Sequence, residues 1–150
     1  MNTSSLTGND EELLCEINRN LDMCAESTTM VLKKVQDREF ITLLTEVIMK
    51  STEFSKQTHN ILHENGIKPE EFSKMKQFSA DMGIMMNTLF DSSDSHIAEM
   101  MVKGLEKGVV SLREMTAEAP PSSDKVSALC CDVADFESTY AHKIGQFVKQ

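Results

Sequence analysis

Apolar side chains recur at every third or fourth position along most of this chain, a spacing that places them on one face of an α-helix. The first run ends near residues 36–37. Its face consists of Leu14, Ile17, Leu21, Cys24, Thr28, Val31 and Val35. Asn9 or Asp10 is expected to cap this helix, because both side chains can accept hydrogen bonds from its free N–H groups. A strand cannot produce this spacing, so the run predicts a helix.

The second run follows the same spacing from Asp37, its expected N-cap, to Gly66. Its face consists of Phe40, Leu44, Val47, Ser51, Phe54, Thr58 and Ile61, flanked by Ile41, Ile48, Ser55 and Leu62. Glycine readily adopts the left-handed conformation that ends many helices. We therefore expect Gly66 to end this helix and Ile67 to fold back onto Leu62, as in a Schellman motif.

Three further apolar runs complete the pattern, and every proline of the chain lies between runs rather than inside one. The third face consists of Phe72, Met75, Phe78, Met82, Met85 and Leu89, the fourth of Ile97, Met101, Leu105, Gly108, Leu112 and Met115, and the fifth of Val126, Leu129, Val133, Phe136, Tyr140, Ile144 and Phe147. The polar residues 91–94 form a turn and N-cap before the fourth run. Ser122 or Ser123 is expected to cap the fifth.

These runs predict an all-α protein of five helices that forms a single domain, residues 9–150, after a disordered tail of residues 1–8. The joints between the runs are short, and short joints force consecutive helices to run antiparallel. Two arrangements fit this pattern. In one, the first, second, fourth and fifth helices form an antiparallel four-helix bundle, and the third is a helical crossover along its length. In the other, all five helices share one elongated core.

Charge and hydropathy narrow the class of protein. The chain has 15 Lys and Arg against 24 Asp and Glu, a net charge of -9, and no basic cluster, which argues against nucleic-acid binding. No apolar run approaches the ~20 residues of a membrane span. Residues 1–8 lack the basic and apolar parts of a signal peptide. We therefore expect a soluble cytoplasmic protein without nucleic-acid partners or membrane spans.

A metal site is the first chemistry to consider, because four-helix bundles can hold two metal ions with Glu-x-x-His motifs. No Glu-x-x-His occurs in this sequence. The nearest pattern is His96-x-x-Glu99 with Asp91 and Asp94 just before it, and these side chains could bind iron or another divalent metal. The alternative is that acids at the start of a helix only complement its dipole.

The cysteines suggest a second kind of chemistry. If the helices alternate in direction, the first and fifth run parallel, and Cys15 lies at the same end of the bundle as Cys130 and Cys131. These three thiols could then form a redox site. The alternative is that Cys24 and Cys130 are small core residues, as free cysteines usually are.

Methionines gather in the predicted third and fourth helices. Because methionine side chains adapt to several partners, they could form a docking surface for a second copy of the chain or another protein. The residues of this surface are Met82, Met85, Met86, Met100 and Met101. The alternative is that they fill gaps in the core. In the fourth helix, the spacing of Gly104 and Gly108 would let a neighbouring helix approach closely.

The layout of two long helices, a connecting helical stretch and two more long helices resembles the ferritin-like superfamily. Residues 20–27 and 95–104 are similar to segments of small uncharacterised bacterial bundle proteins placed in that superfamily. The resemblance implies a ferritin-like fold and, in the best-known members, oxidation chemistry at iron or manganese. The Glu-x-x-His ligands of that chemistry are missing here, so the resemblance bears on the fold and not on an activity.

Catalytic motifs of other kinds are missing from the sequence as well. It contains no Gly-x-Ser-x-Gly nucleophile elbow and no glycine-rich phosphate loop. We therefore expect a non-enzymatic helical-bundle protein that acts through oligomerisation or docking to a protein partner, without a cofactor. The alternatives are a ferritin-like protein that binds or stores iron and a cysteine-based redox sensor.

Overall fold

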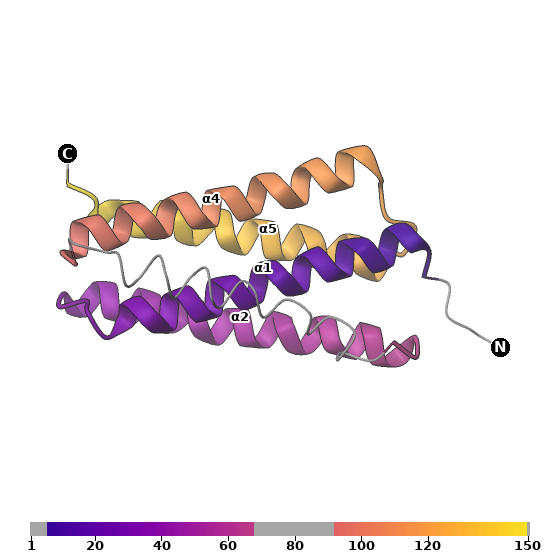
Figure 1. Cartoon of the computed structure of the whole chain (residues 1–150), viewed down its shortest axis with the longest axis horizontal. Helices are drawn as coiled ribbons and strands as arrows, with labels where there is room; N and C mark the ends of the chain where they lie inside the picture. Colours follow the sequence, from indigo (N-terminus) through magenta and orange to yellow (C-terminus); the bar gives the residue numbers. More distant parts are fainter. Residues whose placement is uncertain (1–5, 68–91, 150) are drawn as a thin grey trace.

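The computed structural model describes residues 6–67 and 92–149, and all regular structure in this part of the chain is helical. Four long helices are present, followed by a short 3-10 helix, η2 (Gly145–Phe147) (Figure 1). The long helices are α1 (Gly8–Leu32), α2 (Arg38–Glu64), α4 (Asp94–Glu118) and α5 (Asp124–Ile144). The all-α prediction is thus confirmed. Five helices were predicted and four are counted, because the predicted third helix lies outside the described residues.

The helices pack as two hairpins laid side by side. α1 packs mainly against α2, and α4 against α5, while α1 also contacts α4 and α2 also contacts α5. α2 and α4 both start at the same end of the bundle, so they run parallel, as α1 and α5 do (Figure 1). The described helices therefore form a four-helix bundle, and the choice between the two predicted arrangements depends on residues outside the described part of the chain.

The predicted apolar faces form the core of this bundle. Every predicted face residue of α1 is buried, and in α2 only Phe54 is half-buried. In α4 the two half-buried face residues are Gly108 and Met115. All predicted face residues within α5 are buried, and the last residue of that predicted face, Phe147, lies in η2 and is half-buried. Phe147 stacks on Phe40 of α2 with ring centroids 4.8 Å apart, which seals the end of the core.

Three of the four helix starts agree with the sequence. Asp37, Ser93 and Ser123 cap α2, α4 and α5. The predicted cap of α1 was wrong, because Thr7 is the N-cap and Asp10 lies three residues later in a capping box. In this box the Thr7 N–H donates to Asp10 Oδ2 at 2.9 Å, and the Asp10 N–H donates to Thr7 Oγ1 at 3.2 Å.

The end of α2 has the predicted Schellman geometry. Gly66 has a φ of 72°, in the left-handed region. The Ile67 N–H donates to the Leu62 carbonyl at 2.9 Å, and the Gly66 N–H donates to the His63 carbonyl at 3.1 Å. These two bonds satisfy carbonyls that the helix end would otherwise leave free, and the half-buried Ile67 packs on the core.

Two carboxylates fasten the loops to the neighbouring hairpin, one at each end of the bundle. Asp10 Oδ1 accepts the backbone N–H groups of Ser122 and Ser123 at 2.8 and 3.2 Å. Asp94 accepts the N–H groups of Gln36 and Asp37 at 3.0 and 2.8 Å. Each hairpin thus holds the connecting loop of the other.

Candidate functional site

A cavity of about 300 Å³ lies between α1 and α4. We call it the α1–α4 cavity. Its volume is at the lower end of the range for pockets that bind small molecules, about 300–1,000 Å³. The residues that line it are Glu16, Arg19, Asn20, Met23, Cys24, Ser27, Val31, Met100, Met101, Gly104, Leu105, Lys107, Gly108, Ser111 and Glu137. Glu137 belongs to α5, so three helices contribute to the cavity.

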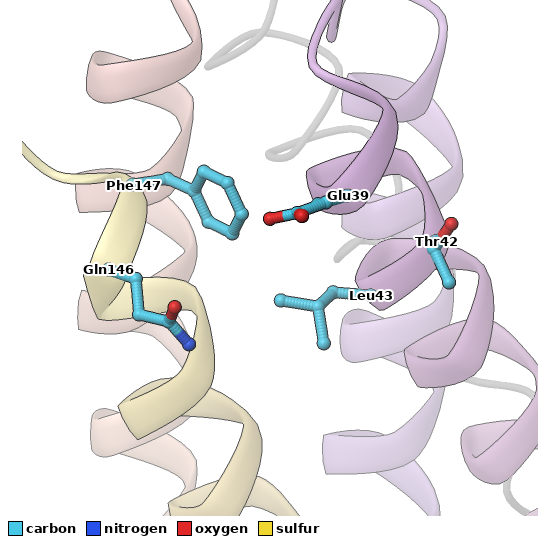
Figure 2. A pocket seen from close by; sticks show the side chains of 5 residues that line it. All are labelled: Glu39, Thr42, Leu43, Gln146 and Phe147. Atoms are coloured by element: carbon cyan, nitrogen blue, oxygen red, sulfur yellow. The ribbon is translucent and has the colours of Figure 1, made fainter.

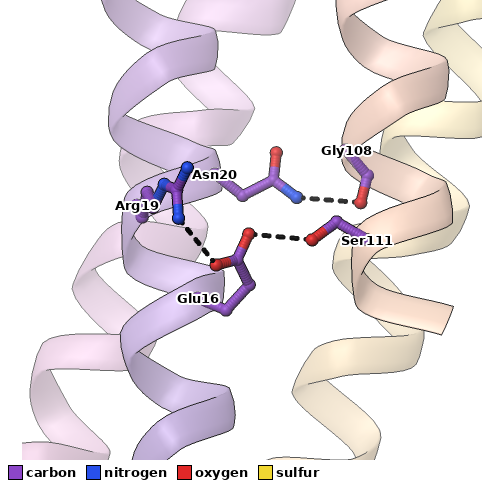
Figure 3. A network of polar contacts seen from close by, with 5 residues as sticks. All are labelled: Glu16, Arg19, Asn20, Gly108 and Ser111. Atoms are coloured by element: carbon purple, nitrogen blue, oxygen red, sulfur yellow. Dashed lines mark hydrogen bonds and ion pairs between the residues drawn. The ribbon is translucent and has the colours of Figure 1, made fainter. Parts of the chain in front are cut away.

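One part of the lining is a polar network that links α1 to α4 (Figure 3). The Ser111 hydroxyl donates to Glu16 Oε2 at 3.0 Å, and Arg19 pairs with Glu16 Oε1 at 3.4 Å. The Asn20 amide donates to the Gly108 carbonyl at 3.1 Å. Glu16 and Asn20 of α1 therefore each have a hydrogen-bond partner on α4, and Glu16 is also paired with Arg19 of its own helix.

The rest of the lining is mostly apolar. Cys24, Val31, Met101 and Leu105 are buried, and their side chains form the lipophilic wall together with the half-buried Met23 and Met100. Methionine side chains can change rotamer at low cost and so adapt to ligands of different shape. A mostly apolar wall with a few placed polar groups is the usual construction of a small-molecule site.

Glu137 is the unusual residue of this cavity. Its exposed fraction is 0%, and neither carboxyl oxygen has a hydrogen-bond partner in the part of the chain that the structure describes. Burial raises the pKa of Glu137 to about 8; the Asn20 side chain acts in the opposite direction, and the Glu16 carboxylate raises the pKa further. The Asn20 amide donates to the Gly108 carbonyl, and among the described residues Glu137 has no hydrogen-bond partner of its own.

Gly108 makes room for these two polar side chains. A Cβ atom at this position would lie 2.5 Å from Asn20 Oδ1 and 2.8 Å from Glu137 Oε1, closer than real contacts allow. A Cβ at Gly104 would have no such neighbour within 4 Å. The predicted close approach of a neighbouring helix backbone is therefore wrong: at Gly108 the side chains of Asn20 and Glu137 come near, and at Gly104 no described atom does.

A second hollow, of about 290 Å³, lies between the start of α2 and η2 (Figure 2). It is lined by Glu39, Thr42, Leu43, Gln146 and Phe147. Glu39, Thr42 and Gln146 are exposed. This hollow holds no buried polar group among its lining residues, so the α1–α4 cavity is the stronger candidate site.

The residues predicted to bind metal are held in other contacts. Asp94 fastens the α1–α2 loop, and Glu99 pairs with Lys103 at 3.1 Å. The backbone N–H of His96 donates to the hydroxyl of Ser93, the N-cap of α4, at 3.2 Å. Asp91 lies outside the described residues. Within residues 6–67 and 92–149, no group of three or more His, Cys, Asp or Glu side chains is placed to hold a metal ion.

All four cysteines are free thiols. Cys24 and Cys130 are buried, as the core interpretation predicted, while Cys15 is half-buried and Cys131 is exposed. Burial raises the pKa of Cys24 to about 12 and that of Cys130 to about 11, which keeps both thiols protonated at neutral pH. The parallel directions of α1 and α5 place Cys15 toward the same end of the bundle as Cys130 and Cys131, as expected (Figure 1).

The predicted methionine surface is divided by the structure. Met82, Met85 and Met86 lie outside the described residues. Met101 is buried and Met100 is half-buried, and both line the α1–α4 cavity. The two described methionines of the predicted surface, Met100 and Met101, thus belong to a cavity wall.

Sequence reasoning missed Glu137 and Asn20 as inward-facing residues. The signal for Glu137 was present, because it continues a strict heptad pattern along α5 with alternating steps of four and three. The positions of this pattern are Val126, Cys130, Val133, Glu137, Tyr140 and Ile144, and all are buried. The predicted face of α5 included Phe136 in place of Glu137, because an aromatic residue at the adjacent position also fits a buried face.

Neither a protein family, nor a curated protein, nor a solved structure matches this chain. Among the described helices, none combines the length and apolar character needed to cross a membrane.

Proposed function

We propose that this protein is a non-enzymatic binding protein that holds a small organic ligand in the α1–α4 cavity. The observation that carries the proposal is Glu137, a fully buried carboxyl group on a cavity wall that has no hydrogen-bond partner in the described part of the chain. Leaving a buried polar group unsatisfied costs about 1–3 kcal/mol. A ligand that donates hydrogen bonds to Glu137 would remove this cost, and its apolar part would cover the methionine wall.

The other lining residues favour binding over catalysis. Glu16 is already bonded to Ser111 and Arg19, and the Cys24 thiol is held protonated by burial. Nucleophilic catalysis requires an activating base within hydrogen-bond reach of the nucleophile. The lining residues of the cavity include no histidine, and in the one hydroxyl–carboxylate pair, Ser111 with Glu16, the carboxylate is also paired with Arg19.

The proposal is tested by nuclear magnetic resonance with isotope-labelled methionine methyl groups. Phenethyl alcohol, a small neutral molecule with an apolar ring, is titrated into the full chain. We expect shifts at Met23, Met100 and Met101, and none at the exposed Met49 of α2. Absence of shifts at the three cavity methionines with this probe, and with its charged analogues described below, contradicts the proposal.

A cavity-filling variant sharpens this test. Gly104 lines the cavity and a Cβ there meets open space, so Gly104→Leu should fold and obstruct the ligand. The matched control is Glu106→Leu, an exposed position on the same helix that does not line the cavity. Only Gly104→Leu is expected to abolish the methionine shifts.

A ferritin-like arrangement with a fifth, crossover helix is part of the proposal. It is supported by the parallel directions of α2 and α4, because α2 ends and α4 begins at opposite ends of the bundle (Figure 1). One long crossover of this kind is typical of ferritin-like bundles. Iron binding, docking or self-association through methionines, and a cysteine-based redox role stay predictions from the sequence.

A further inference from the structure

We infer that the ligand of the α1–α4 cavity is a small organic amine, bound as an ammonium ion against the Glu137 carboxylate with its apolar body against the methionine wall. The inference rests on the proposed binding function and adds the chemical class of the ligand. It is carried by three observations: which charges around the cavity are already paired, where acceptor atoms lie, and what forms the rest of the wall.

The charged or titratable residues of the lining are Glu16, Arg19, Lys107 and Glu137. On α1, Glu16 is paired with Arg19 and accepts the Ser111 hydroxyl. On α4, Lys107 is an exposed residue of the lining. Glu137, from α5, has no hydrogen-bond partner within residues 6–67 and 92–149, and Glu16 acts on it as a like charge. An anionic ligand beside Glu137 would meet the same like-charge repulsion that Glu16 exerts there, whereas a cation would offset it.

The thiols that interact electrostatically with Glu137 do not supply that cation. Cys24 faces it from α1 and Cys130 from α5, and both have a raised pKa, to which Glu137 contributes. A protonated thiol is neutral and only a weak hydrogen-bond donor. The positive charge must therefore come from the ligand.

Two side-chain oxygens, Asn20 Oδ1 and Glu137 Oε1, lie beside Gly108, together with the Asn20 amide nitrogen. Asn20 Oδ1 and Glu137 Oε1 lie 2.5 and 2.8 Å from the position that a Cβ of Gly108 would occupy. The Asn20 amide nitrogen is held by the Gly108 carbonyl, which fixes the orientation of the side chain. An ammonium group has three donors and no acceptor, so it suits a site of convergent oxygens better than a hydroxyl or a carboxylate does.

The remaining wall sets the size and character of the rest of the ligand. It is formed mainly by Met23, Met100, Met101, Leu105 and Val31. A cavity of about 300 Å³ accommodates one small apolar group, such as a phenyl ring on a short alkyl chain.

Binding of an ammonium ion to this site is linked to the release of a proton from Glu137. The pKa of Glu137, raised to about 8 by burial, keeps the carboxyl group mostly protonated at pH 7 in the free protein. An ammonium ion binds the carboxylate, so one proton leaves Glu137 for solvent when the ligand enters. The apparent affinity should rise about tenfold per pH unit from about pH 6 to about pH 8 and then level off.

The inference is tested by calorimetric titration of the full chain with three probes of similar shape: phenethylamine, phenethyl alcohol and hydrocinnamate. We expect phenethylamine to bind most tightly, to release about one proton, and to gain about tenfold in affinity between pH 6 and pH 7. Phenethyl alcohol should release no proton. Hydrocinnamate should bind most weakly.

The variant Glu137→Gln separates the ligand class from the cavity itself. It keeps the size of the side chain and removes its charge, so amine affinity at about pH 8 should fall at least tenfold, by the tenfold-per-1.4-kcal/mol relation, while alcohol affinity stays within about threefold. Thermal unfolding verifies that the variant folds. If it does not, proton release and the pH profile of the natural protein still decide the question.

The outcomes distinguish the two proposals. If phenethyl alcohol shifts the cavity methionines but phenethylamine binds no better and releases no proton, the cavity binds ligands and the amine inference is wrong. If none of the three probes shifts these methionines, both proposals are wrong. Preferential, proton-linked amine binding that is lost in Glu137→Gln supports both.

Discussion

Gly108 determines the shape of the polar part of the α1–α4 cavity. A glycine inside a helix is less favourable than alanine by about 1 kcal/mol, yet α4 has two. At Gly108 the missing side chain gives space to the Asn20 amide and the Glu137 carboxyl group. At Gly104 the space beyond the backbone is open. Substitution by alanine should therefore have opposite effects on the stability of the protein at Gly104 and at Gly108.

We predict that Gly104→Ala stabilises the protein by up to about 1 kcal/mol, because only the helix propensity changes. Gly108→Ala should instead destabilise it by about 1–2 kcal/mol, because Asn20 must move and its bond to the Gly108 carbonyl is weakened. Urea unfolding followed by circular dichroism measures both. Equal stabilisation by the two variants would show that Gly108 has no packing role.

Glu137 predicts an unusual dependence of stability on pH. Its pKa in the folded protein, about 8, lies above the ordinary value of 4.5. The folded state therefore holds this proton more tightly than the unfolded state, and the free energy of unfolding should decrease as pH rises from about 5 to about 8. The expected loss is on the order of 3 kcal/mol.

In Glu137→Gln this decrease should disappear, because glutamine does not titrate. The measurement is the free energy of unfolding in urea at several pH values for both proteins. A matched control is Glu53→Gln, an exposed carboxyl group on α2. The interpretation fails if the natural protein and Glu137→Gln lose stability in parallel over this pH range.

The four described helices were predictable from the sequence. The apolar spacing, the prolines between the runs and the glycine at the end of α2 all indicate the same helix boundaries. The N-cap of α1 was harder to predict, because Thr7, Asn9 and Asp10 can all cap a helix. Asp10 is used instead to accept N–H groups from the α4–α5 loop, more than a hundred residues away. A contact of that range has no local sequence signal, and the same holds for the position of Asn20 opposite Gly108.

We predict that Asp10→Ala destabilises the protein by about 2–4 kcal/mol, because it removes the capping box and leaves the Ser122 and Ser123 N–H groups without their acceptor. Asp94→Ala removes the equivalent bonds at the other end. There they are exposed to water, so the expected loss is only about 1 kcal/mol. Thermal and urea unfolding of the two variants provide the comparison.

The contribution of Asp10 should also depend on pH. Burial alone would raise its pKa, but the backbone N–H groups of Thr7, Ser123 and Ser122 hold it below the ordinary value of 3.8. The stabilisation by Asp10 is therefore complete above that value and is lost as the pH falls through the lower pKa of the folded protein. Asp10→Ala and the natural protein should converge in stability in strong acid, and a constant difference would contradict this assignment.

The whole molecule consists of two hairpins whose contact surface contains the cavity. α1 and α2 form one hairpin, α4 and α5 the other, and Tyr140 of α5 donates to Glu46 of α2 at 2.7 Å on a second line of contact. The parallel directions of α2 and α4 follow from the Asp94 bonds to Gln36 and Asp37. Sequence reasoning left this arrangement open, because helix periodicity carries no information on which helices are neighbours.

We predict distances that test this topology. Spin labels at Glu39 and Glu99 should be close, because both lie near the same end of the bundle. Labels at Glu64 and Glu99 should be farther apart, because α2 has 27 residues and so is ~40 Å long. Double electron–electron resonance measures both pairs in a Cys15→Ser, Cys131→Ser background. The reverse order of distances would mean that α2 and α4 run antiparallel.

The cavity belongs to both hairpins at once, since its walls come from α1 and α4 and Glu137 reaches it from α5. A molecule held there would act as a bridge between two halves of the protein that are far apart in sequence. Separately expressed α1–α2 and α4–α5 fragments should accordingly reassemble more tightly when the amine is added, by mass action. Such a pair would be a split reporter that signals the presence of its own ligand.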